Sequence, residues 1–87
     1  MIDLQYIQTF IVVVETGNFT SAAAMLGYRQ SSVTHHVKML ERAIGVALLE
    51  RSRFSKVSLT EAGQRALVYF ERLLELADEA RTAIINT

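Results

Sequence analysis

The sequence predicts a mainly α-helical domain in which three helices and a short β-hairpin precede one long C-terminal helix. Three observations support this prediction. Apolar residues recur at three- and four-residue steps in the first and third segments, and glycines at 17, 27 and 45 divide the chain into short pieces. The last stretch holds neither proline nor glycine after Gly63. Spacing of this kind is typical of amphipathic helices, which glycine commonly ends.

Composition limits the classes of protein to which the chain can belong. Its 87 residues, of which 51% are hydrophobic, suffice for one core, so we expect one compact unit. The absence of cysteine excludes disulfides and thiolate metal sites and fits a reducing cytoplasm. No apolar run approaches about 18 uninterrupted residues, so we expect no membrane span. The N-terminal segment carries acids in place of a basic leader, so we expect no export signal.

The first two helices are predicted from apolar spacing and from the residues at their ends. In the first segment, the apolar positions that repeat at helical steps are Leu4, Ile7, Phe10, Ile11 and Val14. Gly17 ends this helix. For the alanine-rich second helix we expect Thr20 as the N-cap and Gly27 as the left-handed closing residue.

A third helix begins after the turn GYR, so the second and third helices form a helix-turn-helix. Successive helical residues are rotated by about 100°, which places some side chains on one arc and others opposite. The arc predicted to face the core holds Val33, Val37, Leu40 and Ile44. The outward arc holds Ser31, Thr34, His35, Lys38 and Arg42. This outward arc can reach a partner outside the domain.

The last third of the chain predicts a hairpin and a long helix. The runs LLE and KVSL flank the basic segment RSRFS, which is typical of a β-hairpin, and Thr60 then caps a helix that continues to Thr87. A coiled-coil-like seam along this helix consists of Ala66, Phe70, Leu73, Ala77, Ala80 and Ile84. A second apolar stripe holds Leu67, Tyr69, Leu74 and Leu76. We therefore expect residues 61–87 to form a homodimer interface; the alternative is that the seam is intramolecular core.

Charge is distributed unevenly although the formal net charge is zero. Residues 28–56 contain six basic and two acidic side chains, a balance of plus four, and the flanks contribute minus two each. The six bases are Arg29, Lys38, Arg42, Arg51, Arg53 and Lys56. A central basic region between acidic flanks favours an anionic partner for the third helix and the hairpin.

Together, residues 1–60 describe a winged helix-turn-helix, whose third helix enters the major groove of DNA. The side chains suit that task. Gln30 can bond an adenine edge, Ser31, Ser32 and Thr34 can bond phosphates or bases, and Lys38 can reach a guanine or a phosphate. Arg51 and Arg53 can lie beside phosphates or enter the minor groove, with a smaller expectation for Lys56. Two alternatives stay open: a solvated helix face, and a winged-helix module that docks a protein.

Two further clusters have simpler explanations than metal binding or catalysis. His35 and His36 are adjacent in a helix, point about 100° apart and cannot chelate one ion together. We place His35 at the DNA and His36 in packing contacts at the buried edge. The acidic cluster of Glu71, Glu75, Asp78 and Glu79 fits a solvated helix face. No catalytic or metal-binding motif is present, so we expect no enzyme activity, no cofactor and no metal.

The sequence resembles the N-terminal DNA-binding domain of LysR-type transcriptional regulators over nearly its whole length. The most specific motifs are NFTSAA, the stretch from Gln30 to Glu41 that ends in LE, and LLERS followed by LTEAG. The resemblance implies a winged helix-turn-helix that dimerises through a linker helix and binds an interrupted inverted repeat in duplex DNA. It also implies that a complete protein is a tetramer with a further domain that senses a small-molecule coinducer.

The same resemblance assigns recognition and wing residues, with two departures from the family pattern. Recognition is assigned to Gln30, Ser31, Ser32, Thr34, His35 and Lys38, and the wing contacts to Arg51 and Arg53. The family commonly has serine or threonine where Arg29 stands, so the usual helix cap is absent and the helix start can shift toward Ser31. Arg29 itself can reach a phosphate or remain solvated. The family often has arginine where His35 stands, and an imidazole attracts phosphate less strongly.

Overall fold

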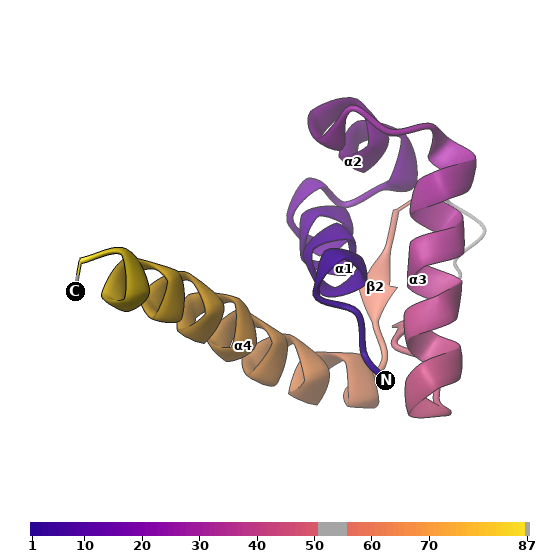
Figure 1. Ribbon diagram of the computed structural model, residues 1–87. Helices are drawn as coiled ribbons and strands as arrows, with labels where there is room; N and C mark the ends of the chain where they lie inside the picture. Colours follow the sequence, from indigo (N-terminus) through magenta and orange to yellow (C-terminus); the bar gives the residue numbers. More distant parts are fainter. Residues whose placement is uncertain (51–55, 87) are drawn as a thin grey trace.

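The computed structural model describes residues 1–50 and 56–86 and confirms the predicted winged helix-turn-helix (Figure 1). Its elements are α1 (Leu4–Thr16), α2 (Phe19–Leu26), α3 (Gln30–Ile44), β1 (Leu49–Glu50), β2 (Ser58–Leu59) and α4 (Glu61–Ile85). The first three helices pack together, β2 contacts α4, and α4 extends away from the three helices. The predicted order of elements is therefore correct.

Local hydrogen bonds explain where the first two helices begin and end. The Asp3 carboxylate accepts from the Gln5 amide at the start of α1, and Gly17 closes that helix with a φ of 85°. The prediction of Thr20 as the cap of α2 is wrong. Asn18 holds this position, because its side-chain oxygen accepts from the Ser21 amide at 2.7 Å and starts the helix two residues earlier. Gly27 closes α2 as predicted.

The core lies where α1, α2 and α3 meet and continues under the hairpin. Its buried side chains are Ile7, Phe10, Val13, Ala22, Ala23, Val33, Val37, Leu40, Leu48, Leu49 and Phe70. The prediction that Val33, Val37 and Leu40 face inward is confirmed. Ile44 belongs to the same arc but is 37% exposed, so its predicted burial is wrong. It lies at the last residue of α3, beyond the end of the packed core.

The two strands confirm the predicted hairpin. β1 and β2 are antiparallel, with Leu49 opposite Leu59 and Glu50 opposite Ser58. Leu48 and Leu49 are buried, whereas Glu50 is exposed, so one face of the hairpin root packs on the core. Arg51 and Arg53, which the sequence assigned to DNA contacts, lie outside the described residues.

Helix α4 starts against the core and then leaves it. Thr60 caps it as predicted, since its hydroxyl accepts from the Gly63 amide at 2.9 Å. Phe70 is 4% exposed and meets the ring of Phe10 edge-on. From Glu75 to Asn86 every residue is exposed, and the helix projects from the domain (Figure 1). This exposed part of α4 is thus accessible to another molecule.

Candidate nucleic-acid interface

The outward face of α3 presents polar and basic side chains to solvent. Gln30, Ser31, His35, Lys38 and Arg42 are exposed, and Ser32 and Thr34 are half-buried. The apolar arc of the same helix is buried beneath them, so α3 is held firmly while its polar face stays open. A helix in this position can enter a groove without moving the core. Which of these residues contact DNA stays a prediction.

The start of α3 lacks a side-chain cap. Arg29 occupies the N-cap position, and among the described residues no side chain bonds to the free amides of this turn. The helix nevertheless begins at Gln30, so its start has not shifted toward Ser31. The amides of Ser32 and Val33 bond to the Arg29 carbonyl, at 3.0 and 3.2 Å. The first amides of a helix lie outside its own hydrogen bonds and favour a phosphate.

Gln30 is oriented by the preceding helix. The Thr20 hydroxyl donates to Oε1 of Gln30 at 3.4 Å, a long hydrogen bond between the start of α2 and the start of α3. Thr20 therefore contacts the start of α3, although it is not the predicted cap. The bond leaves the amide nitrogen of Gln30 with both of its protons for an acceptor on a base edge.

The adjacent histidines lie in different environments, as predicted. His35 is exposed and its ring lies edge-on to Tyr6. The His36 ring stacks on Tyr6, with centroids 4.6 Å apart, and meets Tyr28 edge-on. Its Nδ1 lies 2.8 Å from the hydroxyl of Thr9. The predicted packing role of His36 is confirmed.

Burial and charge change the proton affinity of His36. Its pKa is lowered from the usual 6.5, first because burial disfavours the charged form and second because His35 lies nearby, while Asp3 opposes part of the shift. Tyr6 and Tyr28 also face the ring. His36 is therefore mostly neutral at neutral pH and contributes little to attraction of an anion.

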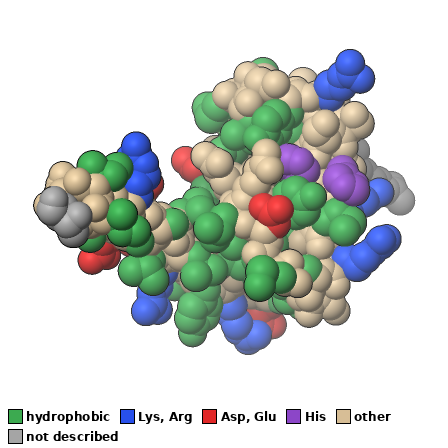
Figure 2. Space-filling model, in the orientation of Figure 1, with side chains coloured by type: hydrophobic (Ala, Val, Ile, Leu, Met, Phe, Trp, Pro, Cys, Tyr) green, Lys and Arg blue, Asp and Glu red, His purple; other side chains and the backbone are tan. Residues whose placement is uncertain are grey.

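The basic side chains of α3 point to solvent, whereas its one acidic side chain points to the hairpin. Lys38 and Arg42 are exposed, and in the described part of the chain neither forms an ion pair. Glu41, the acid between them, turns toward the hairpin instead and accepts from the amides of Leu48 and Leu49. Figure 2 shows the two histidines with basic side chains above and below them along the same edge of the molecule. The exposed edge of α3 is accordingly positive.

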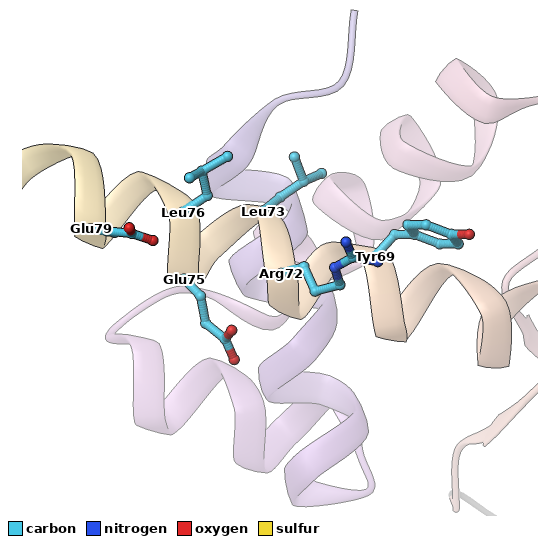
Figure 3. Close-up of a pocket in the computed structure, with 6 residues that line it drawn as sticks. All are labelled: Tyr69, Arg72, Leu73, Glu75, Leu76 and Glu79. Carbon is cyan, nitrogen blue, oxygen red and sulfur yellow. The ribbon is translucent and has the colours of Figure 1, made fainter.

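The exposed part of α4 carries a second surface. Leu73 and Leu76 point to the same side of the helix, Glu75 points away from them, and a groove of about 450 Å³ lies along this face (Figure 3). The Arg72 guanidinium lies 5.7 Å from the centre of the Tyr69 ring. Phe70 and half-buried Ala66 pack into the domain's own core. The predicted seam residues that remain exposed are Leu73, Ala77, Ala80 and Ile84.

Three residues connect the elements that surround α3, and the sequence did not predict these contacts. Thr9 is 1% exposed and bonds to His36, the Tyr28 hydroxyl accepts from the side-chain Nε2 of Gln5, and Glu41 bonds to the root of the hairpin. Thr9 lies three residues after half-buried Tyr6 and one helical turn before buried Val13, so its inward direction could have been read from the spacing. The Glu41 contact depends on the path of residues 47–49, which no spacing indicates.

The described residues form neither a metal site nor a membrane-spanning helix. Within residues 1–50 and 56–86, no three His, Asp or Glu side chains gather closely enough to hold a metal ion. In the same ranges, no helix combines the length and the apolar character needed to cross a bilayer. Glu71, Glu75, Asp78 and Glu79 are all exposed.

Comparisons with known proteins agree with the geometry of α2 and α3. Residues 4–64 match the family model described as "Bacterial regulatory helix-turn-helix protein, lysR family". The chain is 43% identical over 81 residues to the uncharacterized HTH-type transcriptional regulator YwqM of Bacillus subtilis (strain 168), covering 93% of this chain and 27% of that protein. The chain spans about a quarter of the length of the curated relatives that it matches.

Solved structures that contain a similar domain include complexes with DNA. A CbnR_DBD-DNA complex is 38% identical with a TM-score of 0.84, covering 94% of this chain and 98% of that one. A complex of BenM_DBD with benA site 1 DNA is 30% identical with a TM-score of 0.91, covering 97% of this chain and 96% of that one. Similarity at this level extends over the helix-turn-helix, the hairpin and α4 together.

Proposed function

The chain belongs to the lysR family of bacterial regulatory helix-turn-helix proteins, and from that membership we propose how its LysR-type DNA-binding domain reads duplex DNA. The observation that carries the proposal is the orientation of α3. Its valine and leucine side chains are buried, while its amide, hydroxyl, imidazole and ammonium groups are open to solvent. A helix held in this way enters the major groove with its polar face against the bases.

In this proposal the start of α3 reads bases and the flanking groups hold phosphates. Gln30 bonds an adenine edge through its amide, while Thr34 and His35, one turn further along, reach the next base pairs. Ser31, Ser32 and Lys38 bond bases or phosphates according to their distance from the groove floor. Arg29 and the first amides of α3 lie where a phosphate can bind.

The hairpin supplies a second contact in the proposal. Lys56, which precedes β2, is exposed and adds a positive charge at the root of the hairpin. Arg51 and Arg53 remain assigned to the backbone or the adjacent minor groove on the sequence alone. Contacts by both α3 and the hairpin would lengthen the stretch of DNA that one domain covers.

We further propose that two copies pair through the exposed face of α4. Pairing of these helices would place two recognition helices on successive major grooves, about 34 Å apart, and would match an inverted repeat near a promoter. Related DNA-bound domains, the CbnR and BenM structures, have a similar helix in the same position. The proposed activity is binding without catalysis, and because the partner is chromosomal DNA we place it in the cytoplasm. A complete protein is proposed to be a tetramer controlled by a small-molecule coinducer.

A titration tests DNA binding against the alternative, a module that docks a protein. The anisotropy of labelled mixed-sequence duplex DNA is measured with increasing protein at about 50 and 200 mM salt. Because phosphate contacts release counterions, we expect the affinity to fall by about 100-fold between the two salt concentrations. Absence of salt-dependent DNA affinity would favour protein docking by the same polar face.

A further inference from the structure

The root of the hairpin is bonded to the outward-facing helix through one carboxylate. Oε2 of Glu41 accepts hydrogen bonds from the amides of Leu48 at 2.8 Å and Leu49 at 3.2 Å. Leu48 is the last residue before β1, and Leu49 is the first residue of that strand. Bonds to a charged acceptor are stronger and more directional than bonds between neutral groups. Glu41 therefore fixes where the hairpin leaves the surface of α3.

The same backbone is held from its other side by the start of α4. The Thr60 amide donates to the Leu48 carbonyl at 3.0 Å, and the Thr60 hydroxyl donates to the Ala47 carbonyl at 2.7 Å. The backbone of Gly63 lies so close to the Leu48 carbonyl that a Cβ would overlap it. These bonds join the hairpin root to the start of α4, and the Val57 amide, which donates to the Gly17 carbonyl at 2.9 Å, joins the β2 side to the end of α1. The buried side chains of Leu48 and Leu49 pack on the core. The Glu41 carboxylate adds two hydrogen bonds between the root and α3.

We propose that Glu41 is a positioning residue for DNA binding, which fixes the hairpin root on α3 and so keeps the contacts of both elements in register on one duplex. The inference rests on the proposed function above. Glu41 does not touch the DNA in this arrangement, because its carboxylate is turned against protein backbone and would repel a phosphate. Glu41 preorganises the binding surface. Because it holds the hairpin and α3 in one rigid unit, both can contact DNA without a further loss of conformational entropy on binding.

The test uses two lengths of DNA, because α3 can contact both duplexes whereas the hairpin can contact only the longer one. The unaltered protein first enriches its preferred duplexes from a random-sequence pool. One enriched duplex is then made in a long form and in a short form, and the short form lacks the base pairs on either side of the positions that α3 contacts. Dissociation constants are measured by anisotropy for the long and the short duplex. We expect the unaltered protein to prefer the long duplex by about tenfold.

Substitutions at position 41 isolate the acceptor from the charge. Glu41→Ala and Glu41→Gln have the same net charge, but the glutamine keeps an oxygen at the same reach. Glu41→Asp keeps the charge but is one methylene too short to reach both amides. Glu50→Gln is a matched control, because it removes from β1 an exposed carboxylate that accepts from the Ser58 hydroxyl at 3.4 Å, on the strand that follows.

The proposal predicts a specific pattern of preferences. Glu41→Ala and Glu41→Asp should reduce the preference for the long duplex from about tenfold to about twofold, whereas Glu41→Gln and Glu50→Gln should retain most of it. Circular dichroism confirms folding, and if Glu41→Ala does not fold, Glu41→Asp gives the answer.

The proposal is overturned if folded Glu41→Asp keeps the full preference for the long duplex. That outcome includes the case in which the variant binds both duplexes more weakly by the same factor, as a merely structural role requires. If the unaltered protein enriches no duplex, the proposed function itself fails, and that outcome is distinct from a retained preference.

Discussion

The hydroxyl of Thr9 lies 2.8 Å from Nδ1 of His36 and joins the buried face of α1 to α3. Thr9 also donates to the Gln5 carbonyl at 3.1 Å, and because a hydroxyl has one proton, it then accepts from an Nδ1–H of His36. The imidazole is at the same time stacked on Tyr6. Because a hydrogen bond is directional, the bond between Thr9 and His36 restricts the rotation of α3 about its axis, while the stacked rings restrict its distance from α1.

Thr9→Val should destabilise the domain by removing this hydroxyl while keeping the side-chain shape. We expect a loss of about 1–2 kcal/mol in the free energy of unfolding, because Nδ1 of His36 is left half-buried without its partner. Urea unfolding measures the loss. The same substitution in a His36→Ala background is the control and should cost about 1 kcal/mol less. If the two losses simply add, the bond contributes nothing to stability.

Acid should destabilise the domain through His36. The pKa of His36 is lowered in the folded state, so between that pKa and about 6.5 the unfolded chain binds a proton that the folded chain does not. This contribution to stability is complete above about pH 6.5 and is lost as the pH falls through the lowered pKa.

Urea unfolding at several pH values between about 7.5 and 5 compares the unaltered chain with His36→Gln. The unaltered chain should lose more stability on acidification than the variant. At neutral pH the variant should be less stable by about 1 kcal/mol, because it loses the ring stacking. Parallel pH profiles for the two proteins would contradict this role of His36.

The elements could be predicted because their boundaries are marked by residues with strong local preferences. Gly17, Gly27 and Gly45 adopt positive φ at the ends of three helices, and the threonine before α4 caps it. Thr20 was misassigned because asparagine and threonine both cap helices, and the sequence does not show which of two nearby residues is used. The structure uses Asn18, whose side chain accepts from the Ser21 amide.

The candidate site could be predicted only in part, because periodicity gives direction and not distance. The buried and exposed sides of α3 follow from a 100° step, as Val37 and Lys38 show. Ile44 was misplaced because the arc continues beyond the end of the core. The bonds of Glu41 to the hairpin root join segments whose relative path depends on the whole fold, so no local pattern indicates them.

Gly63→Ala should destabilise the domain although alanine favours helices. A Cβ at this position would overlap the Leu48 carbonyl oxygen, which is backbone and cannot rotate away. We expect a net loss of about 1–3 kcal/mol in unfolding free energy, after a gain of about 1 kcal/mol from helix propensity. Gln64→Ala, at the exposed next position, is the control and should change stability by less than about 0.5 kcal/mol. A stabilised Gly63→Ala would show that the close approach is not maintained in solution.

Leu73→Asp should convert the proposed dimer into monomers. Leu73 is 41% exposed in the single chain, and burying an aspartate in a helix pair without a partner is costly. Sedimentation velocity over a range of protein concentrations measures the change. Thr82→Asp adds the same charge about 180° around α4 and should leave the dimer intact. A Leu73→Asp variant that still sediments as a dimer would exclude this face of α4 as the interface.

Gln30→Ala should weaken binding to a preferred duplex and relax the choice of one base. The Gln30 side chain is exposed at the first residue of α3, and its amide nitrogen is available to a base edge while Thr20 bonds the oxygen. We expect a cost of about 1–3 kcal/mol in binding free energy on the preferred site.

Lys38→Ala is the comparison. If Lys38 bonds a phosphate, that variant should weaken all duplexes similarly and reduce the salt dependence. Affinities for the enriched duplex, for its single-base variants and for random DNA distinguish the two effects. Equal affinity of Gln30→Ala and the unaltered protein for every duplex would mean that the first turn of α3 does not reach the bases.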